Sequence, residues 1–217
     1  MLFRSWARGN TRAEIFDAML RKEVYATTGP RMTVRVFGGW DFSPGDMKRN
    51  WVRDGYRKGV PMGGTLQSPK RARGERPSFI VSALKDPIGA NLDRVQVIKG
   101  WIDKAGATHE KVFDVAWSDA AKRQPVGGKV PAVGDTVDVA RASYTNAIGA
   151  PELTTIWADP EFDPTAKAFY YVRVIEIPTP TWVAFDALRY KLKLPPEVRV
   201  KAQERAYTSP IWYDPPK

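Results

Sequence analysis

The chain has no cysteine and a single histidine, His109, among its 217 residues. The absence of cysteine excludes disulfide bonds and thiolate nucleophiles or metal ligands. A catalytic zinc, manganese or iron site needs several histidine and carboxylate ligands that converge on one point. One histidine cannot supply such a set. We therefore expect no metal, no other cofactor, and no hydrolysis of phosphate, sulfate or carboxylic esters by this chain alone.

Signatures of several other protein classes are missing as well. No run of 18 apolar residues predicts a transmembrane helix, and we expect no membrane partner. The segment Met1 to Arg8 has an arginine within its apolar stretch and no small-residue cleavage site, so it does not read as a signal peptide. There is no Gly-x-Ser-x-Gly nucleophile elbow, and neither Gly38-Gly39 nor Gly63-Gly64 continues into a phosphate-binding loop.

Apolar residues make up 43% of the chain, with eight Trp, nine Phe and eight Tyr, which indicates a packed core. Apolar residues at alternate positions predict strands. These segments are Thr33–Val36, Phe79–Ala83, Arg94–Ile98, Lys111–Trp117, Thr136–Val139, Thr154–Trp157, Phe169–Ile175 and Tyr207–Tyr213, the last with Pro210 at an edge or bulge. Turn residues separate the segments, so we predict a mainly β fold: an antiparallel β-sandwich of the immunoglobulin-like or a similar type.

A helix is predicted before the first strand. Thr11 can cap its start, Glu14 completes a capping box, and β-prone residues end it near Glu23. The apolar residues that share one face are Ile15, Phe16, Met19 and Leu20. A soluble monomer seldom leaves such a face open. We expect this helix to fold back onto the sandwich, or else to form a symmetric homodimer.

A second helix is predicted over 181–192, where four apolar side chains share a face and two prolines follow. Those apolar residues are Trp182, Phe185, Leu188 and Leu192. The chain then divides into an N-terminal helix with its connecting segment (1–31) and a sandwich domain (32–217). Residues 41–77 form a long insertion of mixed aromatic, glycine and basic character without clean periodicity, and we expect it to be irregular.

Several segments resemble one known family. They are Arg21–Arg31, Val34–Trp40, Gly59–Gly64, Ala83–Pro87, Asn91–Arg94, Lys99–Trp101, Ala168–Arg173 and Glu204–Tyr213. Together they resemble the domain-of-unknown-function 3604 family of bacteria over nearly the whole chain. That family looks related to metal-dependent hydrolases with a barrel of the polymerase-and-histidinol-phosphatase (PHP) type.

The resemblance implies a specific role. In that family these segments follow a histidine-rich barrel, so the chain resembles the non-catalytic C-terminal part of such a hydrolase. Its implied function is that of an accessory domain which packs against a catalytic barrel and shapes its cleft. The implied partner is a separately encoded barrel or a second copy bound through the N-terminal helix. The resemblance implies that the relatives are exported. The sequence does not indicate the compartment of this chain.

Two alternative functions follow from the residues. A free-standing ligand- or carbohydrate-binding sandwich would use exposed aromatic side chains such as Trp40, Trp51 or Trp117 on a concave strip. The second alternative is a nucleic-acid-binding module, which the formal net charge of +10 suggests. The densest basic clusters are at 48–58 and 70–76. The second cluster lacks periodicity and is typical of a solvated loop, so we do not expect a nucleic-acid partner.

Two further candidate sites have ordinary structural alternatives. Asp159 to Asp163 has oxygen ligands at alternate positions, as calcium loops do, but it lacks the turn glycine and the distal glutamate. We expect an ordinary polar loop there. The residues that could form an anion-accepting rim are Thr27, Thr28, Gly29, Arg31, Arg57 and Lys58. The alternative for that rim is a simple turn with Arg31 in a structural ion pair.

Overall fold

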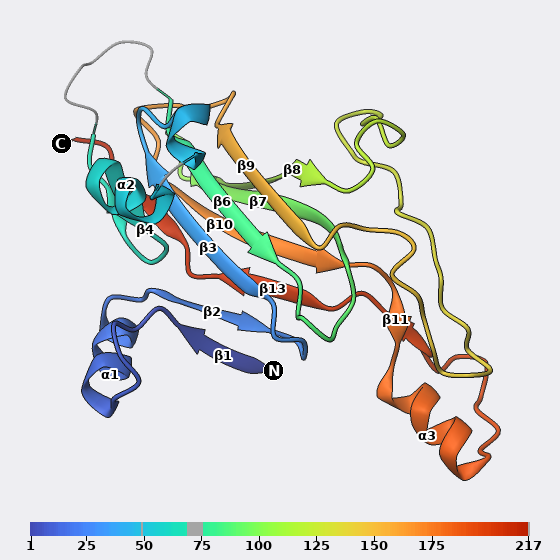
Figure 1. Cartoon of the computed structure of the whole chain (residues 1–217). Coiled ribbons are helices and arrows are strands. Elements are labelled where there is room, and N and C mark those ends of the chain that lie inside the picture. Colours follow the sequence, from blue (N-terminus) through green and yellow to red (C-terminus); the bar gives the residue numbers. More distant parts are fainter. Residues whose placement is uncertain (49, 69–75, 217) are drawn as a thin grey trace.

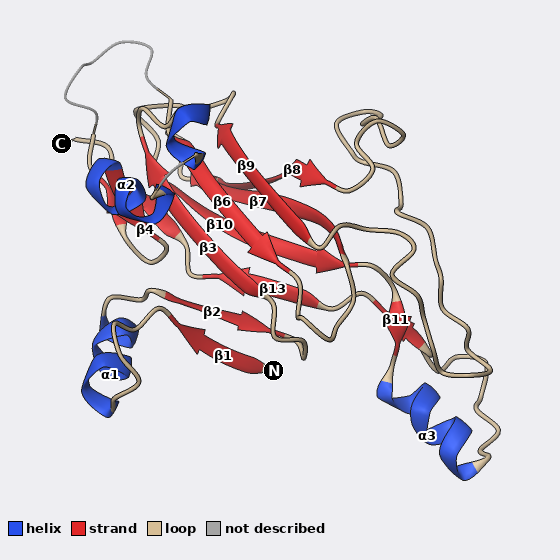
Figure 2. Ribbon diagram, viewed as in Figure 1, coloured by secondary structure: helices blue, strands red, loops and turns tan. Residues whose placement is uncertain are grey.

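The computed structural model describes residues 1–48, 50–68 and 76–216, and it consists of two β-sheets with three α-helices at their margins (Figures 1 and 2). The helices are α1 (Arg12–Leu20), α2 (Trp51–Lys58) and α3 (Trp182–Tyr190), with a 3-10 turn, η1 (Pro44–Met47), before α2. None of the helices in these residues is long and apolar enough to cross a membrane.

The larger sheet has eight strands. They are β1 (Leu2–Ser5), β2 (Val24–Thr27), β5 (Thr65–Leu66), β7 (Leu92–Ile102), β8 (Thr108–Trp117), β10 (Ala168–Glu176), β13 (Arg205–Thr208) and β14 (Ile211–Tyr213). The central strand β10 pairs with β7 along one edge and with β13 and β14 in succession along the other. Beyond these neighbours, β8 follows β7, the pair β2 and β1 follows β13, and β5 pairs parallel to β14.

The smaller sheet has the strand order β4-β3-β6-β9, and all its pairs are antiparallel. Its strands are β3 (Thr33–Gly39), β4 (Gly59–Pro61), β6 (Ser78–Leu84) and β9 (Glu152–Ala158). A separate short pair, β11 (Thr179–Pro180) with β12 (Lys201–Ala202), leads into and out of the α3 region.

The core lies between the two sheets. Val34 and Val36 point inward from β3, and Val97, Tyr170 and Val172 point inward from the larger sheet. All five are almost fully buried, and they belong to one apolar cluster. The period-2 alternation that predicted the strands therefore reflects burial of one face of each sheet, and the mainly β, antiparallel architecture is confirmed.

Two strand predictions need correction. Residues 136–139 form no strand and make only an isolated bridge from Asp138 to Ser143, because this stretch belongs to a long loop outside both sheets. The predicted strand from Tyr207 to Tyr213 is divided into β13 and β14. Pro210 lacks the N–H that a continuous ladder would need at the division.

The insertion 41–77 is more regular than expected. It contains η1, α2, β4 and β5 in the residues that the structure describes. Helix α2 escaped prediction because it has only eight residues and a glycine, Gly55, in its middle. This glycine is required, since a Cβ there would lie 2.5 Å from ring atoms of Phe37. Tight packing overrides helix propensity at this position.

Helix α1 begins as predicted, with Thr11 Oγ1 accepting a hydrogen bond from the Glu14 amide at 3.3 Å. It ends at Leu20, three residues earlier than expected, because Lys22 adopts a left-handed φ of 58° before β2. The predicted folding back of its apolar face onto the sandwich is wrong. Phe16 is 57% and Leu20 65% exposed, since the helix packs through the side that carries Ala18.

Candidate functional site

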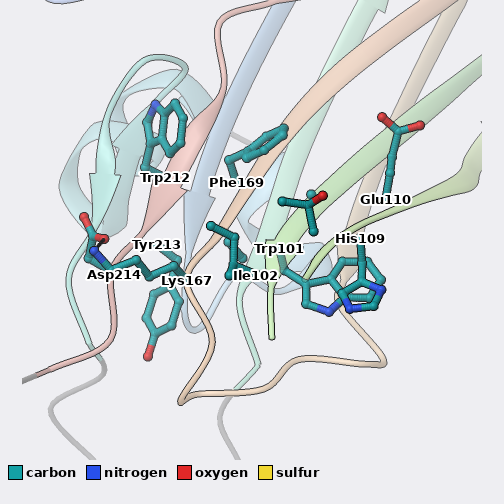
Figure 3. A pocket seen from close by; sticks show the side chains of 12 residues that line it. Trp101, Ile102, His109, Glu110, Lys167, Phe169, Trp212, Tyr213 and Asp214 are labelled. Carbon is teal, nitrogen blue, oxygen red and sulfur yellow. Dashed lines mark ion pairs between the residues drawn. The ribbon is translucent and has the colours of Figure 1, made fainter. Parts of the chain in front are cut away.

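A cavity of about 570 Å3 opens on the outer face of the larger sheet, on the side away from the core (Figure 3). We call it the outer-face pocket. Its lining side chains on that face are Ile102, Thr108, Glu110, Phe169 and Trp212, with Lys167 and Asp214 at one end. They come from β7, β8, β10, β14 and the segments flanking β10 and β14. A cavity of this size suits a small-molecule ligand.

The floor of the pocket is one cross-strand row. The register aligns Trp212 of β14 with Phe169 of β10, Phe169 with Gly100 of β7, and Gly100 with Glu110 of β8. Side chains in such a row lie on the same face of a sheet. The row therefore presents two aromatic rings, a gap at the glycine, and then a carboxylate.

Gly100 determines how the floor is shaped. A Cβ at this position would lie 2.5 Å from Cε1 of Phe169, so only glycine allows the phenyl ring to extend over β7. The Phe169 ring meets the Trp212 indole at a centroid distance of 5.3 Å and an interplanar angle of 50°. Trp212 remains 44% exposed and Phe169 half-buried. The result is an open apolar platform rather than a closed core.

Polar groups border the platform at two places. Glu110 and Thr108 are exposed on β8, and Lys167 pairs with Asp214 at 3.5 Å at the opposite end of the pocket. Both members of that pair are exposed to solvent. The border thus offers hydroxyl, carboxylate and ammonium groups that can exchange hydrogen bonds with a ligand resting on the rings.

A second group of side chains lies beneath the floor. Trp101 and His109 stack at 5.1 Å and also line the pocket (Figure 3), although strand alternation places their side chains on the opposite face of the sheet from Trp212 and Phe169. The surface position predicted for His109 in a β-hairpin is confirmed, and its Nε2 lies 2.8 Å from Asp103 Oδ2. This hydrogen bond lowers the pKa of Asp103.

Deeper still, a buried ion pair supports β7 and β10. Lys99 Nζ lies 2.6 Å from Asp159 Oδ2, and the Tyr170 hydroxyl donates to the same carboxylate at 2.7 Å. Burial, and then the Asp159 charge, raise the pKa of Tyr170 above its usual range. Lys99 also donates to the Glu161 carbonyl at 2.7 Å. The run 159–163 therefore serves as an anchoring loop, and its first carboxylate is occupied by Lys99 and Tyr170.

The residues expected to form an anion-accepting rim are Thr27, Thr28, Gly29, Arg31, Arg57 and Lys58. Near the end of β2, the Thr28 hydroxyl donates to the Glu204 carboxylate and accepts from the Arg205 amide at 2.9 Å. The Arg31 amide donates to Asp86 Oδ2 at 2.6 Å. Thr27 is fully buried beside β13, and Gly29 continues the same turn. Thr28 and the Arg31 amide therefore already bind carboxylates of the protein itself.

The other two residues of the set lie elsewhere. Lys58 Nζ pairs with Asp46 Oδ1 at 2.7 Å, and Arg57 pairs with Asp54 at 2.8 Å. Lys58 lies at one end of β3, because the next residue, Gly59, pairs with Gly39, the last residue of that strand. Arg31 lies at the other end, shortly before the first residue of β3, Thr33. Seven extended residues separate these ends by roughly 20 Å, so the structure does not bring the six residues together.

The aromatic residues named for a ligand-binding surface are not the ones in the pocket. Trp40 is half-buried, donates to the Gln67 carbonyl at 2.8 Å and packs on Tyr213. Trp51 packs on Phe37, and Trp117 is half-buried. Sequence reasoning missed Phe169 and Trp212. The available signal was the alternation in β10, which places Phe169 opposite to the buried Tyr170.

Other candidate chemistry finds little support in the described residues. Within 1–48, 50–68 and 76–216, no three histidine, aspartate or glutamate side chains lie close enough to hold a metal ion. Of the basic clusters, Arg49 and residues 70–75 lie outside the described residues. Of the basic side chains of α2, Arg57 and Lys58 are paired with carboxylates, and Arg53 is exposed.

Comparison with known proteins gives one match. The model of a family described as "Protein of unknown function (DUF3604)" matches residues 2–215, which is nearly the whole chain. No curated protein and no solved structure matches the chain.

Proposed function

The chain belongs to the DUF3604 family, and we propose that it acts as a non-catalytic accessory domain that binds a carbohydrate in its outer-face pocket. The observation that carries this proposal is the aromatic platform of Phe169 and Trp212 bordered by hydrogen-bonding side chains. A pyranose ring has an apolar face of C–H groups and a periphery of hydroxyls. It therefore matches a flat aromatic surface with polar groups at its edge.

The charges at the pocket fit a neutral ligand. Lys167 and Asp214 pair with each other, which leaves Glu110 as the carboxylate beside the platform. A carboxylate accepts hydrogen bonds from two neighbouring hydroxyl groups without requiring a charged ligand. The ligand would lie along the row from Trp212 to Glu110.

Calorimetric titration with a panel of neutral oligosaccharides tests this proposal. We expect binding by the unmodified protein and roughly fivefold weaker binding by Trp212→Ala, since an aromatic contact contributes about 1 kcal/mol beyond area burial. Trp182→Ala is a matched control, because Trp182 is 75% exposed on α3, which lies at the end of the molecule opposite the C-terminus (Figure 1), whereas the pocket includes Asp214 near that terminus. Equal affinities of the two variants, or no binding of any sugar, would refute the proposal.

A second candidate function is packing against a catalytic barrel, carried by exposed apolar side chains at the N-terminal edge. These are Leu2 and Phe3 of β1 with Phe16, Met19 and Leu20 of α1. Strand β1 is also an edge strand of the larger sheet, paired with β2 alone among the described strands. An open edge and an apolar helix face together suit a large partner surface.

Co-purification with a histidine-rich barrel protein encoded beside this chain would test the second candidate. Phe16→Ser with Met19→Ser should abolish the complex, and the same double change should abolish a homodimer if that forms instead. A protein that stays monomeric and binds no barrel would eliminate this candidate. The sugar-binding measurement would be unaffected by that result.

A further inference from the structure

Helix α3 stands apart from the sandwich, at the end of the molecule opposite α2 and the C-terminus (Figure 1). It joins the rest of the chain through the short β11–β12 pair. Ala184 is the one buried residue of the helix. On its inner side, Ala187 and Leu188 line a shallow depression with Val139 and Val200. The opposite side of α3 faces solvent.

The solvent-facing side of α3 carries large apolar side chains. Trp182 is 75% and Phe185 50% exposed on this side. Leu188 and Leu192, 51% and 55% exposed, lie at the rim of the depression that they help to line. These are the residues that the helical spacing placed on one face, and we call them the α3 apolar face. Exposed aromatic and aliphatic side chains that are contiguous on one helix are typical of an interaction surface.

Cations surround this face. The segment 181–201 contains five basic residues and two acidic ones, Asp186 and Glu197. The basic residues are Arg189, Lys191, Lys193, Arg199 and Lys201. All five are exposed, and Lys201 pairs with Asp135. The remaining four make the surroundings of the apolar face complementary to an anionic surface.

The shape and size of the face favour a lipid surface over a protein. A stable protein interface buries more than about 1,000 Å2 in a closely packed patch. The α3 apolar face belongs to a nine-residue helix that protrudes, and its aromatic members Trp182 and Phe185 lie outside the shallow depression beside the helix. A bilayer interface needs no complementary shape, and it accepts Trp, Phe and Leu while its anionic headgroups attract Lys and Arg.

We propose that α3 docks the domain on the surface of a bilayer that contains anionic lipid. Trp182 and Phe185 enter the interfacial layer, and Arg189, Lys191 and Lys193 face the lipid phosphates. This contact is peripheral and needs no membrane span. It revises the expectation of no membrane partner, which rested on the lack of a long apolar run.

Co-sedimentation with phosphatidylcholine vesicles, with and without phosphatidylglycerol, tests the proposal. The unmodified protein should bind the anionic vesicles, bind the zwitterionic ones at least roughly tenfold less, and be released by high salt. Trp182→Ser with Phe185→Ser should reduce binding to anionic vesicles roughly tenfold. Phe16→Ser with Met19→Ser on α1 is the matched control and should bind like the unmodified protein.

Loss of vesicle binding can be distinguished from loss of folding. Circular dichroism should show that both double variants remain folded, because all four side chains are substantially exposed. Failure of the unmodified protein to bind anionic vesicles would overturn the proposal and leave the α3 apolar face to a protein partner. Equal vesicle binding by the α3 variant and the α1 control would overturn it as well.

Discussion

Replacing Glu176 with glutamine should stabilise the protein at alkaline pH and leave it unchanged at acidic pH. Glu176 ends β10 with its side chain 1% exposed, and its Oε1 has no hydrogen-bond partner among the described residues. Burial, followed by the charges of Glu204 and Asp86, raises the pKa of this carboxyl from 4.5 to about 8. The folded protein therefore holds a neutral glutamic acid at neutral pH.

The size and direction of the effect follow from this pKa. Between pH 4.5 and about 8 the folded chain keeps a proton that the unfolded chain releases, so stability falls as the pH rises. Each pKa unit corresponds to about 1.4 kcal/mol, which gives about 3 kcal/mol at pH 7 and about 5 kcal/mol above pH 8 as an upper value. Glutamine does not titrate, so the Glu176→Gln variant escapes this loss.

Urea denaturation of both proteins from pH 5 to pH 9 measures the effect. The difference in free energy of unfolding between Glu176→Gln and the unmodified protein should grow with pH across this range. Glu197→Gln changes an exposed glutamate and should alter stability by less than about 0.5 kcal/mol at each pH. A difference for Glu176→Gln that stays constant or shrinks with pH would refute the reasoning.

Three other sites probe the fold: Gly100, the exposed face of α1, and Lys99. Gly100→Ala should cost about 1–3 kcal/mol in urea denaturation and weaken sugar binding, because the new Cβ displaces Phe169, and Phe169→Leu should recover part of the stability. Phe16→Ser with Met19→Ser should change the free energy of unfolding by less than about 0.5 kcal/mol, since both side chains are exposed; a clear drop in melting temperature would contradict this. Lys99→Met should cost about 3–5 kcal/mol by chemical denaturation, because it leaves a buried carboxylate unpaired, and an unchanged stability would show that the ion pair contributes nothing.

Local patterns predicted much of this fold. Alternation in β3, β6, β7, β8, β9 and β10 identified these strands, because each buries one face against the core. The cap at Thr11 likewise placed the start of α1 correctly. Prediction failed where long-range packing decides the structure. Gly55 appears incompatible with a helix interior until the Phe37 ring that excludes a Cβ is taken into account.

The candidate site shows the same division. Alternation alone places Phe169 on the face opposite to Tyr170, but it cannot show that Trp212, more than forty residues later, lies beside it. Likewise, Thr28 and Arg31 have the groups that bind anions. Their surroundings depend on Glu204 and Asp86, which arrive from other parts of the chain. The charge and type of each candidate residue could be read from the sequence, but the sequence could not predict which residues from distant parts of the chain would surround it.

The most direct test of the proposed sugar-binding role is a nuclear magnetic resonance titration with neutral oligosaccharides. Signals in the outer-face pocket should shift in a saturable manner, above all the Gly100 amide and the Trp212 indole N–H. The Trp182 indole signal should stay unchanged and serves as an internal control. Absence of shifts with every sugar, or shifts that avoid Gly100 and Trp212, would contradict the proposed role of the pocket.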